Sequence, residues 1–560
     1  MRKTLALILA MLMIGSCCAC GDTAQTEKNK KDKETVSNNS SSGNVSSDDS
    51  SSEGASSDES TPTQGTVSLQ DTTIFENYIP IDDSIEYPDS SVEYGTAPST
   101  LDTAWNADVT AKKGNSDSLA DTMRKKVLNA KNTLETYKVK GTVYYVSPNG
   151  DDSNDGKTPK TAFKSIKAPI FTMNTLKSGD AVLFERGGVW RLTSAIKCKE
   201  GITYGSYGKG EKPTFYGSPY NYAMADYWTP SNRQNVWKVT IADSDIGLAV
   251  FNHGEIVGVK KLNGIIALEK NGDYYFNQKE DTLYLYCDKG NPGKAFFDIE
   301  FGLNKAVFNV SNASDVTIDN LRIKYSGRFG IDMCGCDNSV ITNCEIGFIG
   351  GAIQSGTTRL GNGIQVWNGV TNHRVENCWI YQIYDAALTF QGDNSYSASH
   401  MSDEYKNITY KNNIIEYSTY SFEFWHGNSE PQVSYAAIEN FICTNNVSRF
   451  VGFGWGRQRA DHTGNHICVF DRSFPNAKGN KINDNIFDLA DSYIVKWGFK
   501  SGANNGEWDI SNNTYYHGPN RFGDAMRFGS QVTADNISSL KSAIDIFEKN
   551  PKSVVWVDSH

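Results

Sequence analysis

The second half of the chain repeats a short pattern of hydrophobic and polar positions. A β-forming run ends at an asparagine, a second β-forming run follows, and the pattern returns after a loop of variable length. The repeats align on Asn320, Asn343, Asn377, Asn413, Asn446, Asn485 and Asn513. Because each repeat returns to the same corner, the pattern predicts an all-β right-handed parallel β-helix, in which each coil pairs with its neighbours. An all-β sandwich, the alternative, needs hairpin turns at short intervals.

Asparagines at one corner of successive coils can bond to one another and to the turn backbone. Cys344 and Cys378 each follow such an asparagine, so we expect small interior residues there instead of a disulfide framework. No cysteine spacing indicates a zinc site, and we expect no metal.

Two segments have helical spacing instead. Residues 118–136 are predicted to cover the open N-terminal end of the solenoid, and residues 537–549 form a similar candidate at the C-terminus. Between about 226 and 301 the repeat is less regular, and the run Asn277–Cys287 predicts a β excursion from the stack.

The N-terminus has the layout of a secretory signal. Arg2 and Lys3 precede an apolar run at 5–14, which is too short for a stop-transfer helix. The segment Ile14-Gly15-Ser16-Cys17 resembles the bacterial lipobox, which implies lipidation of Cys17 and a place at the extracellular face of the cell membrane. Cys20 also follows a small residue, and an ordinary cleaved signal is the alternative.

These features divide the chain into five parts. We expect a signal peptide at 1–20, a polar linker at 21–100, an N-terminal cap region at 101–140, the β-helix at 141–530 and a C-terminal helical cap at 531–560. The linker is rich in Ser, Asp, Glu, Lys and Asn, which bury too little apolar surface to fold, so it predicts a disordered tether. The net charge of −11 argues against nucleic acid as a partner, and we expect a monomer.

The start of the predicted β-helix carries a family resemblance. Residues 143–156, 161–166, 179–188 and 202–208 resemble the opening of pectate-lyase-like parallel β-helix proteins. The resemblance covers about 141–518 and implies the fold and a polysaccharide partner. It implies no single reaction, because this superfamily includes lyases, hydrolases, epimerases and non-enzymatic fibres.

The second β run of each coil supplies the candidate catalytic residues. Asp385 and Glu423 fall on nearby positions of adjacent coils, which stack roughly 4.8 Å apart. A pair of carboxyl groups is the usual apparatus of glycoside hydrolysis. Glu423 stands between two phenylalanines, so it points outward if their rings face the core. Asp385 fits a turn cap equally well, and Asp332 is the reserve carboxylate.

Aromatic and polar residues near this face are candidates for substrate binding. They are Gln365, Trp367, Gln391, Trp425, His426, Trp455, Arg457 and Arg359. The tryptophans fit core packing as well as sugar stacking. Residues 361–368 and 384–387 also look similar to β-helix proteins grouped with glycoside hydrolases, in which an acidic residue often stands at the Gln365 position. The glutamine here implies that a catalytic role has moved or been lost.

Three functions remain open on the sequence. A glycoside hydrolase without a cofactor comes first. A polysaccharide lyase would use Lys496 or Arg457 as base, with calcium to neutralise a uronate. The Asp-rich run 151–156 lacks the final Glu of an EF-hand and fits a capped turn. A non-catalytic module that binds glycan through aromatic residues is the third.

Overall fold

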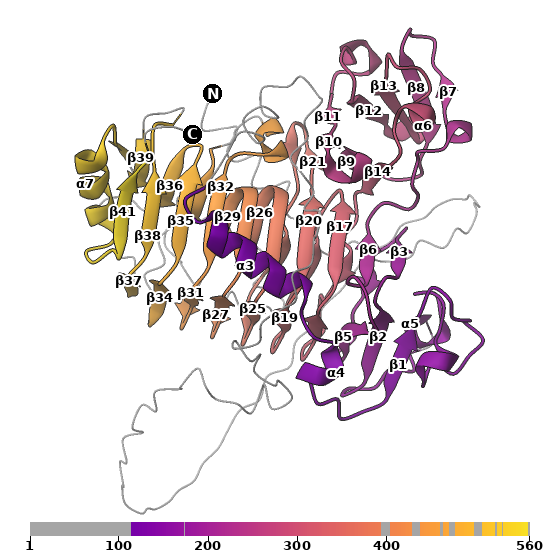
Figure 1. Ribbon diagram of the computed structural model, residues 1–560, viewed down its shortest axis with the longest axis horizontal. Coiled ribbons are helices and arrows are strands. Elements are labelled where there is room, and N and C mark those ends of the chain that lie inside the picture. Colours follow the sequence, from indigo (N-terminus) through magenta and orange to yellow (C-terminus); the bar gives the residue numbers. More distant parts are fainter. Residues whose placement is uncertain are drawn as a thin grey trace, which may run out of the picture. The chain divides into compact units, whose positions relative to one another are not determined.

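A computed structural model of the protein describes residues 114–557, with gaps at 173, 394–403, 428–436, 460–462, 470–476, 498–506, 521–523 and 529 (Figure 1). The predicted signal peptide, Cys17 and the predicted linker lie outside the described residues. Within the described ranges, no helix is both long and apolar enough to span a membrane.

The described chain winds into coils that stack as three parallel sheets, which confirms the predicted parallel β-helix (Figure 1). The first sheet contains β1 (Val143–Val146), β2 (Ala181–Glu185), β5 (Thr203–Tyr207), β16 (Thr317–Asp319), β19 (Val340–Thr342), β25 (Arg374–Glu376), β28 (Thr409–Lys411), β31 (Ile442–Thr444), β34 (Asn480–Asn483) and β37 (Trp508–Ser511).

The second and third sheets are joined, because the long strands β26 (Trp379–Asp393) and β29 (Ile414–Gly427) run through both. The second sheet also contains β3 (Val189–Arg191), β6 (Thr214–Tyr216), β17 (Arg322–Ser326), β20 (Glu345–Ile349), β32 (Val447–Val451), β35 (Ile486–Ala490), β38 (Thr514–His517) and β41 (Ser553–Trp556). The third also contains β4 (Ile196–Lys197), β15 (Phe308–Asn309), β18 (Ile331–Cys334), β23 (Ile364–Trp367), β33 (Asn465–Val469), β36 (Tyr493–Trp497) and β39 (Asp524–Phe528).

Short elements decorate the coils. A small parallel sheet at one corner contains β24 (Val370–Thr371), β27 (Glu404–Lys406) and β30 (Ala437–Glu439). Antiparallel additions are β21 (Ile353–Ser355) with β22 (Thr358–Arg359), and β40 (Ser530–Thr533) beside β39. Other short helices include α5 (Pro169–Thr172) and the 3-10 turn η8 (Trp455–Gln458).

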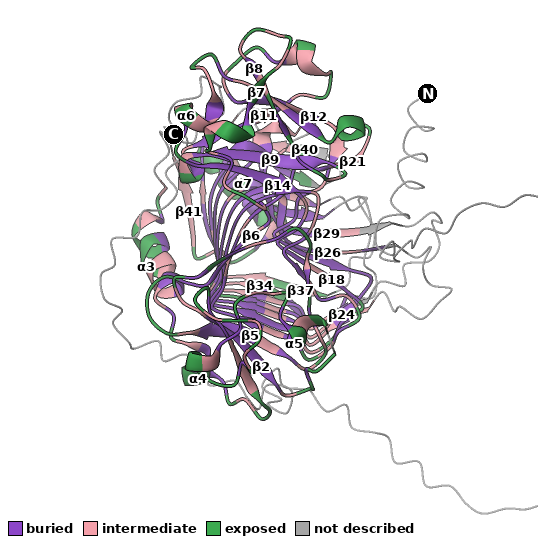
Figure 2. Cartoon of the chain, turned by 90° about the vertical axis from the view of Figure 1, so that its right-hand side faces the viewer, coloured by how far each residue is buried: buried purple, intermediate pink, exposed green. Residues whose placement is uncertain are grey.

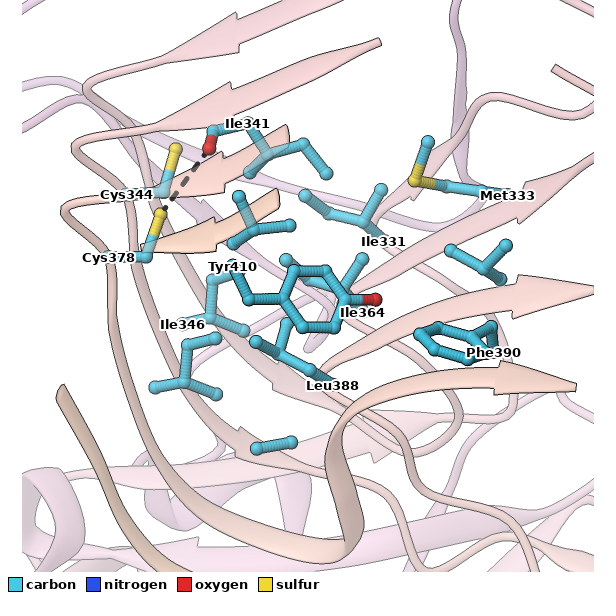
Figure 3. Packing of buried hydrophobic residues seen from close by; sticks show 14 of the residues in the cluster. Ile331, Met333, Ile341, Cys344, Ile346, Ile364, Cys378, Leu388, Phe390 and Tyr410 are labelled. Carbon is cyan, nitrogen blue, oxygen red and sulfur yellow. Dashed lines mark hydrogen bonds between the residues drawn. The ribbon is translucent and has the colours of Figure 1, made fainter. Parts of the chain in front are cut away.

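The interior of the solenoid is filled by matching residues of successive coils. Ile331, Ile364 and Leu388 pair in register on the third sheet and lie in one stack (Figure 3). All three side chains are fully buried. Their stacking removes apolar surface from water, which stabilises the fold. Figure 2 shows burial running along the strands from coil to coil, while exposed residues gather on loops and short helices.

The corner asparagines occupy two neighbouring positions. Asn320, Asn343 and Asn377 have positive φ angles near 50–60°, a conformation that asparagine tolerates. The aligned asparagines of later coils stand one residue further on, inside the solenoid, where the earlier coils carry Leu321, Cys344 and Cys378. The sequence alignment on asparagine therefore merged two structural positions.

The interior asparagines form a ladder. The side-chain amide of Asn413 donates to Asn446 Oδ1 at 3.0 Å, and that of Asn446 donates to Asn485 Oδ1 at 2.9 Å. Asn485 bonds Asn513 in the same way, and Asn513 bonds Glu548. At the other end of the ladder, Cys344 and Cys378 lie at the same interior corner, and both are free thiols (Figure 3).

The two longest helices of the described residues lie at the C-terminal end and on one face of the solenoid. α7 (Ile537–Phe547) packs Leu540 and Ile544 into the main core beside β39 and β41. The predicted N-terminal helix is two helices, α3 (Asp117–Leu128) and α4 (Thr133–Thr136). α3 does not cover the end of the solenoid: it lies along the outer face of the second sheet, where Arg124 pairs with Glu416 at 2.5 Å (Figure 1).

The irregular region of the sequence is a small subdomain with its own core, inserted between β6 and β15. One sheet contains β7 (Thr229–Pro230), β8 (Val236–Thr240), β11 (Val259–Lys260), β12 (Asp273–Asn277) and β13 (Thr282–Tyr286). The other contains β9 (Ile246–Phe251), β10 (Ile256–Val257) and β14 (Ile299–Leu303), and a short helix, α6 (Pro292–Ala295), precedes β14. The predicted β excursion is its hairpin of β12 and β13.

Candidate active site

The candidate site lies on the outer face of the third sheet. Phe422 and Phe424 of β29 point into the core, so Glu423 between them points outward. The strand register places Glu423 beside Thr389 of the preceding coil and Cys468 of the following one. The same row continues through Lys496 to Arg527. This outer row therefore gathers polar side chains from coils far apart in sequence.

Glu423 is covered although it lies on an outer face, with 4% of its surface exposed. The pKa of this carboxyl is raised to about 8, first by burial and then by the negative charge of Asp385, against the opposing effect of Arg459. Thr389 Oγ1 donates to Oε2 at 3.1 Å and Gln391 Nε2 donates to the same oxygen at 2.5 Å. Within the described part of the chain, no residue bonds the other oxygen, Oε1.

Asp385 stands where β26 bends between the second and third sheets. The pairing of β26 with β29 shifts between Ile383 and Ala386, and the Asp385 amide donates to the Gly361 carbonyl at 2.9 Å. The carboxylate forms an ion pair with Arg459, whose guanidinium lies 5.4 Å from the ring centre of Tyr420. Asp385 is therefore held as a charged group, while Glu423 is held in an environment that favours its proton.

A relay of side-chain amides leads to Glu423. Asn362 donates to Gln365 Oε1, Gln365 Nε2 donates to Gln391 Oε1 at 3.2 Å, and Gln391 donates to Glu423. Asn362 is itself fixed, because its Oδ1 accepts the amide of Ala386 at 3.0 Å. Gln365 is only 4% exposed, and its two hydrogen bonds fix the side chains of Asn362 and Gln391 on either side of it.

Two tryptophans cover the next outer row. Trp367 and Trp425 lie on either side of Gln391 in the strand register, and their ring centres are 5.7 Å apart at an interplanar angle of 22°. The indole nitrogen of Trp367 is buried without a hydrogen-bond partner in the described ranges. The stack therefore lies over Gln391, the residue that donates a hydrogen bond to Glu423.

Other residues named from the sequence lie elsewhere. Trp455 is fully buried, and its indole nitrogen donates to the Gln382 carbonyl at 2.8 Å. Arg457 pairs with Asp491 at 2.5 Å. Arg359 is buried and donates to the Gly351 carbonyl at 2.7 Å, with its guanidinium over Tyr384. These side chains support the segments around the site and expose little or no surface to a substrate.

Asp332 and His426 complete the sequence-predicted set. Asp332 belongs to the same outer row but lies three coils before Glu423, and burial raises its pKa. It is therefore separated from the Glu423 carboxyl by the side chains of Gln365 and Thr389. His426 is the penultimate residue of β29, and its side chain lies outside the described residues.

Sequence reasoning did not find Arg459, Thr389 or Asn362. The sequence could have indicated Thr389, because its alternation with the core residues Leu388 and Phe390 predicts that it points outward. Arg459 is 74 residues from Asp385 in the sequence and reaches it through η8, which no periodic pattern marks. Across the described ranges, no group of three or more His, Cys, Asp or Glu is placed to hold a metal ion.

No protein-family model matches the sequence, and no curated protein matches it significantly. Solved structures with a similar arrangement include a glycoside hydrolase, with a TM-score of 0.41 and 9% identity over 74% of this chain and 96% of that one. A GH136 lacto-N-biosidase from Eubacterium ramulus has a TM-score of 0.35 and 13% identity over 81% and 71% of the two chains. Pectate lyase Pel9A has a TM-score of 0.30 and 14% identity over 70% and 73%. Values this low extend no activity from those proteins to this chain.

Proposed function

We propose that this protein hydrolyses a glycosidic bond of a polysaccharide, with Glu423 as general acid and Asp385 as the carboxylate that assists the attack. The observation that carries the proposal is the contrast between the two groups. Glu423 is buried with a raised pKa of about 8, whereas Asp385 is ion-paired with Arg459. Two carboxyl groups held in opposite protonation states are what this reaction needs.

The proposed steps use each group once. Glu423 is mostly protonated at neutral pH and transfers its proton to the glycosidic oxygen as the bond to the anomeric carbon breaks. Both hydrogen bonds that Glu423 accepts fall on Oε2, which leaves Oε1 to carry and donate the proton. Water then adds to the anomeric carbon and gives its proton to the Asp385 carboxylate. The stacked indoles of Trp367 and Trp425 bind an adjacent sugar.

The test is a screen of plant and microbial polysaccharides for two products, with a soluble protein that begins near Gly65. New reducing ends without an unsaturated, ultraviolet-absorbing product are expected. Glu423→Gln and Asp385→Asn are each expected to lower the rate by about 10²-fold or more. Arg374→Gln, on the first sheet, is the matched control and is expected to keep full activity.

Two outcomes would replace the proposal. An absorbing product would show a β-elimination, in which Lys496 is the candidate base. Glycan binding without any product, unchanged in Glu423→Gln, would show a binding module.

We also propose that the protein is exported and anchored by a lipid on Cys17, which would place the site at the extracellular face of the cell membrane. The sequence Ile14-Gly15-Ser16-Cys17 supports this location. Metabolic labelling with a fatty acid is expected to mark the full-length protein and not Cys17→Ala. Labelling that persists in this variant would reject Cys17 as the anchor.

A further inference from the structure

We infer that Arg459 is a positioning residue that keeps Asp385 ionised beside Glu423, and that the inserted subdomain holds Arg459 in place. The roles of the two groups rest on the proposed function, but the coupling between Arg459 and Asp385 is measurable without it. Arg459 pairs with Asp385, and the two side chains are only 14% and 15% exposed. Water therefore screens this ion pair weakly.

The segment before Arg459 is fixed to the solenoid at three successive residues. The indole of Trp455 is fully buried and donates to the Gln382 carbonyl. At Gly456 an added Cβ would lie 2.6 Å from Thr419 Oγ1, so this turn needs glycine to approach the strands so closely. Arg457 then pairs with Asp491 of a later coil. The backbone that carries Arg459 therefore has little freedom to move.

The fourth residue, Gln458, connects the segment to the inserted subdomain. Its side-chain amide donates to the Gly258 carbonyl at 2.8 Å, and its Oε1 accepts the Lys260 amide at 3.4 Å. Lys260 is in turn buried in an ion pair with Asp245. The Ile353 amide donates to the same carboxylate at 2.6 Å, which joins the subdomain to the coil. The subdomain thus contacts the residue next to Arg459.

A fixed positive charge here acts on both carboxyl groups. Arg459 contacts Asp385 directly and stabilises its ionised form. It lowers the pKa of Glu423 as well, but burial and the charge of Asp385 outweigh this effect. Because the guanidinium is already in place, no reorganisation is needed when the charges change during a reaction. Removing it should make both groups easier to protonate.

The decisive experiment compares pH profiles of wild type, Arg459→Gln and Arg459→Lys, with Arg374→Gln as control. Asp385 must be ionised and Glu423 protonated, so a rise of both pKa values moves both limbs of the activity profile to higher pH. We expect a shift of about one pH unit in Arg459→Gln, with at least partial restoration in Arg459→Lys. Limbs that stay at the wild-type pH would overturn the inference, because a purely structural loss lowers the rate without moving them.

A second measurement is independent of activity. The thermal stabilities of Asp385→Asn, Arg459→Gln and the double variant are compared with wild type. If Asp385 and Arg459 act as a pair, the double variant loses less thermal stability than the two single variants lose together. Gln458→Ala is expected to weaken this coupling. Additive losses would overturn the inference even if the protein is active, whereas coupling in a protein that is inactive on every substrate would reject only the proposed hydrolysis.

Discussion

Gln391 donates a hydrogen bond of 2.5 Å from Nε2 to Oε2 of Glu423, although the two residues belong to different coils. The Gln391 amide can donate to Glu423 in either protonation state of the acid, because the hydrogen bond needs only a lone pair on Oε2. The free proton position is therefore left at Oε1. This contact ties the orientation of the candidate acid to the stacking of the coils.

The buried acid should make stability fall as pH rises. Glu423 has a folded pKa of about 8 against an ordinary value of 4.5. Between these values the folded state binds more protons than the unfolded state, so stability is lost over this range. We therefore expect the free energy of unfolding of Glu423→Gln, relative to that of wild type, to rise by several kcal/mol between about pH 4.5 and pH 8. Denaturant titrations at both pH values measure this difference. A constant difference between the two proteins would show that the acid is not perturbed.

The tryptophan stack should affect substrate affinity more than chemistry. Trp425→Ala removes one ring of the pair with Trp367, while Gln391 and Glu423 keep their hydrogen bond. We expect KM to rise about tenfold, as for the loss of one stacking contact of about 1.4 kcal/mol, with kcat within about twofold of wild type. Trp425→Phe is expected to keep much of the affinity. A fall in kcat alone would assign the ring to the catalytic step instead.

A buried histidine should make the protein sensitive to acid. His373 is fully buried with Ser339 Oγ at 2.8 Å from Nδ1, and burial lowers its pKa to about 4. The unfolded state binds the proton first, so stability is complete above about pH 6.5 and is lost as the pH falls toward 4. The loss is roughly 3 kcal/mol. Thermal unfolding of His373→Asn between pH 7 and 4 is expected to show a smaller decline than wild type.

The interior asparagine ladder should tolerate substitution far less than the outer row of Asn372, Asn407 and Asn440, whose side chains also bond one another. Asn485 is buried and bonds Asn446, Asn513 and the Cys443 carbonyl. Asn485→Ala leaves several buried groups unpaired, so we expect a loss of about 2–4 kcal/mol in urea unfolding.

The matched control for that variant is Asn407→Gly. Asn407 bonds Asn372 and Asn440 but is only half-buried, and glycine keeps its positive φ of 54°. Water can replace the lost bonds, so we expect a loss below about 1 kcal/mol. Equal losses in Asn485→Ala and Asn407→Gly would mean that the interior position has no special importance.

The sequence by itself determined the coil and the direction of side chains within it. Alternation of apolar and polar residues around Glu423 is enough to place it outward, because a strand has a period of two. The repeated asparagines were enough to predict a solenoid, and the cysteines after Asn343 and Asn377 were correctly expected inside it. These features depend on local residues and on neighbours one coil away.

The tertiary structure alone decided which side chains meet. Loops of different length separate the coils, so the sequence did not show that Gln391 bonds Glu423 or that the aligned asparagines fall into two positions. It gave no sign that Arg459 reaches Asp385, because that contact depends on a turn held by an inserted subdomain. Local periodicity fixes the faces of a strand, whereas the site depends on long-range contacts that periodicity does not encode.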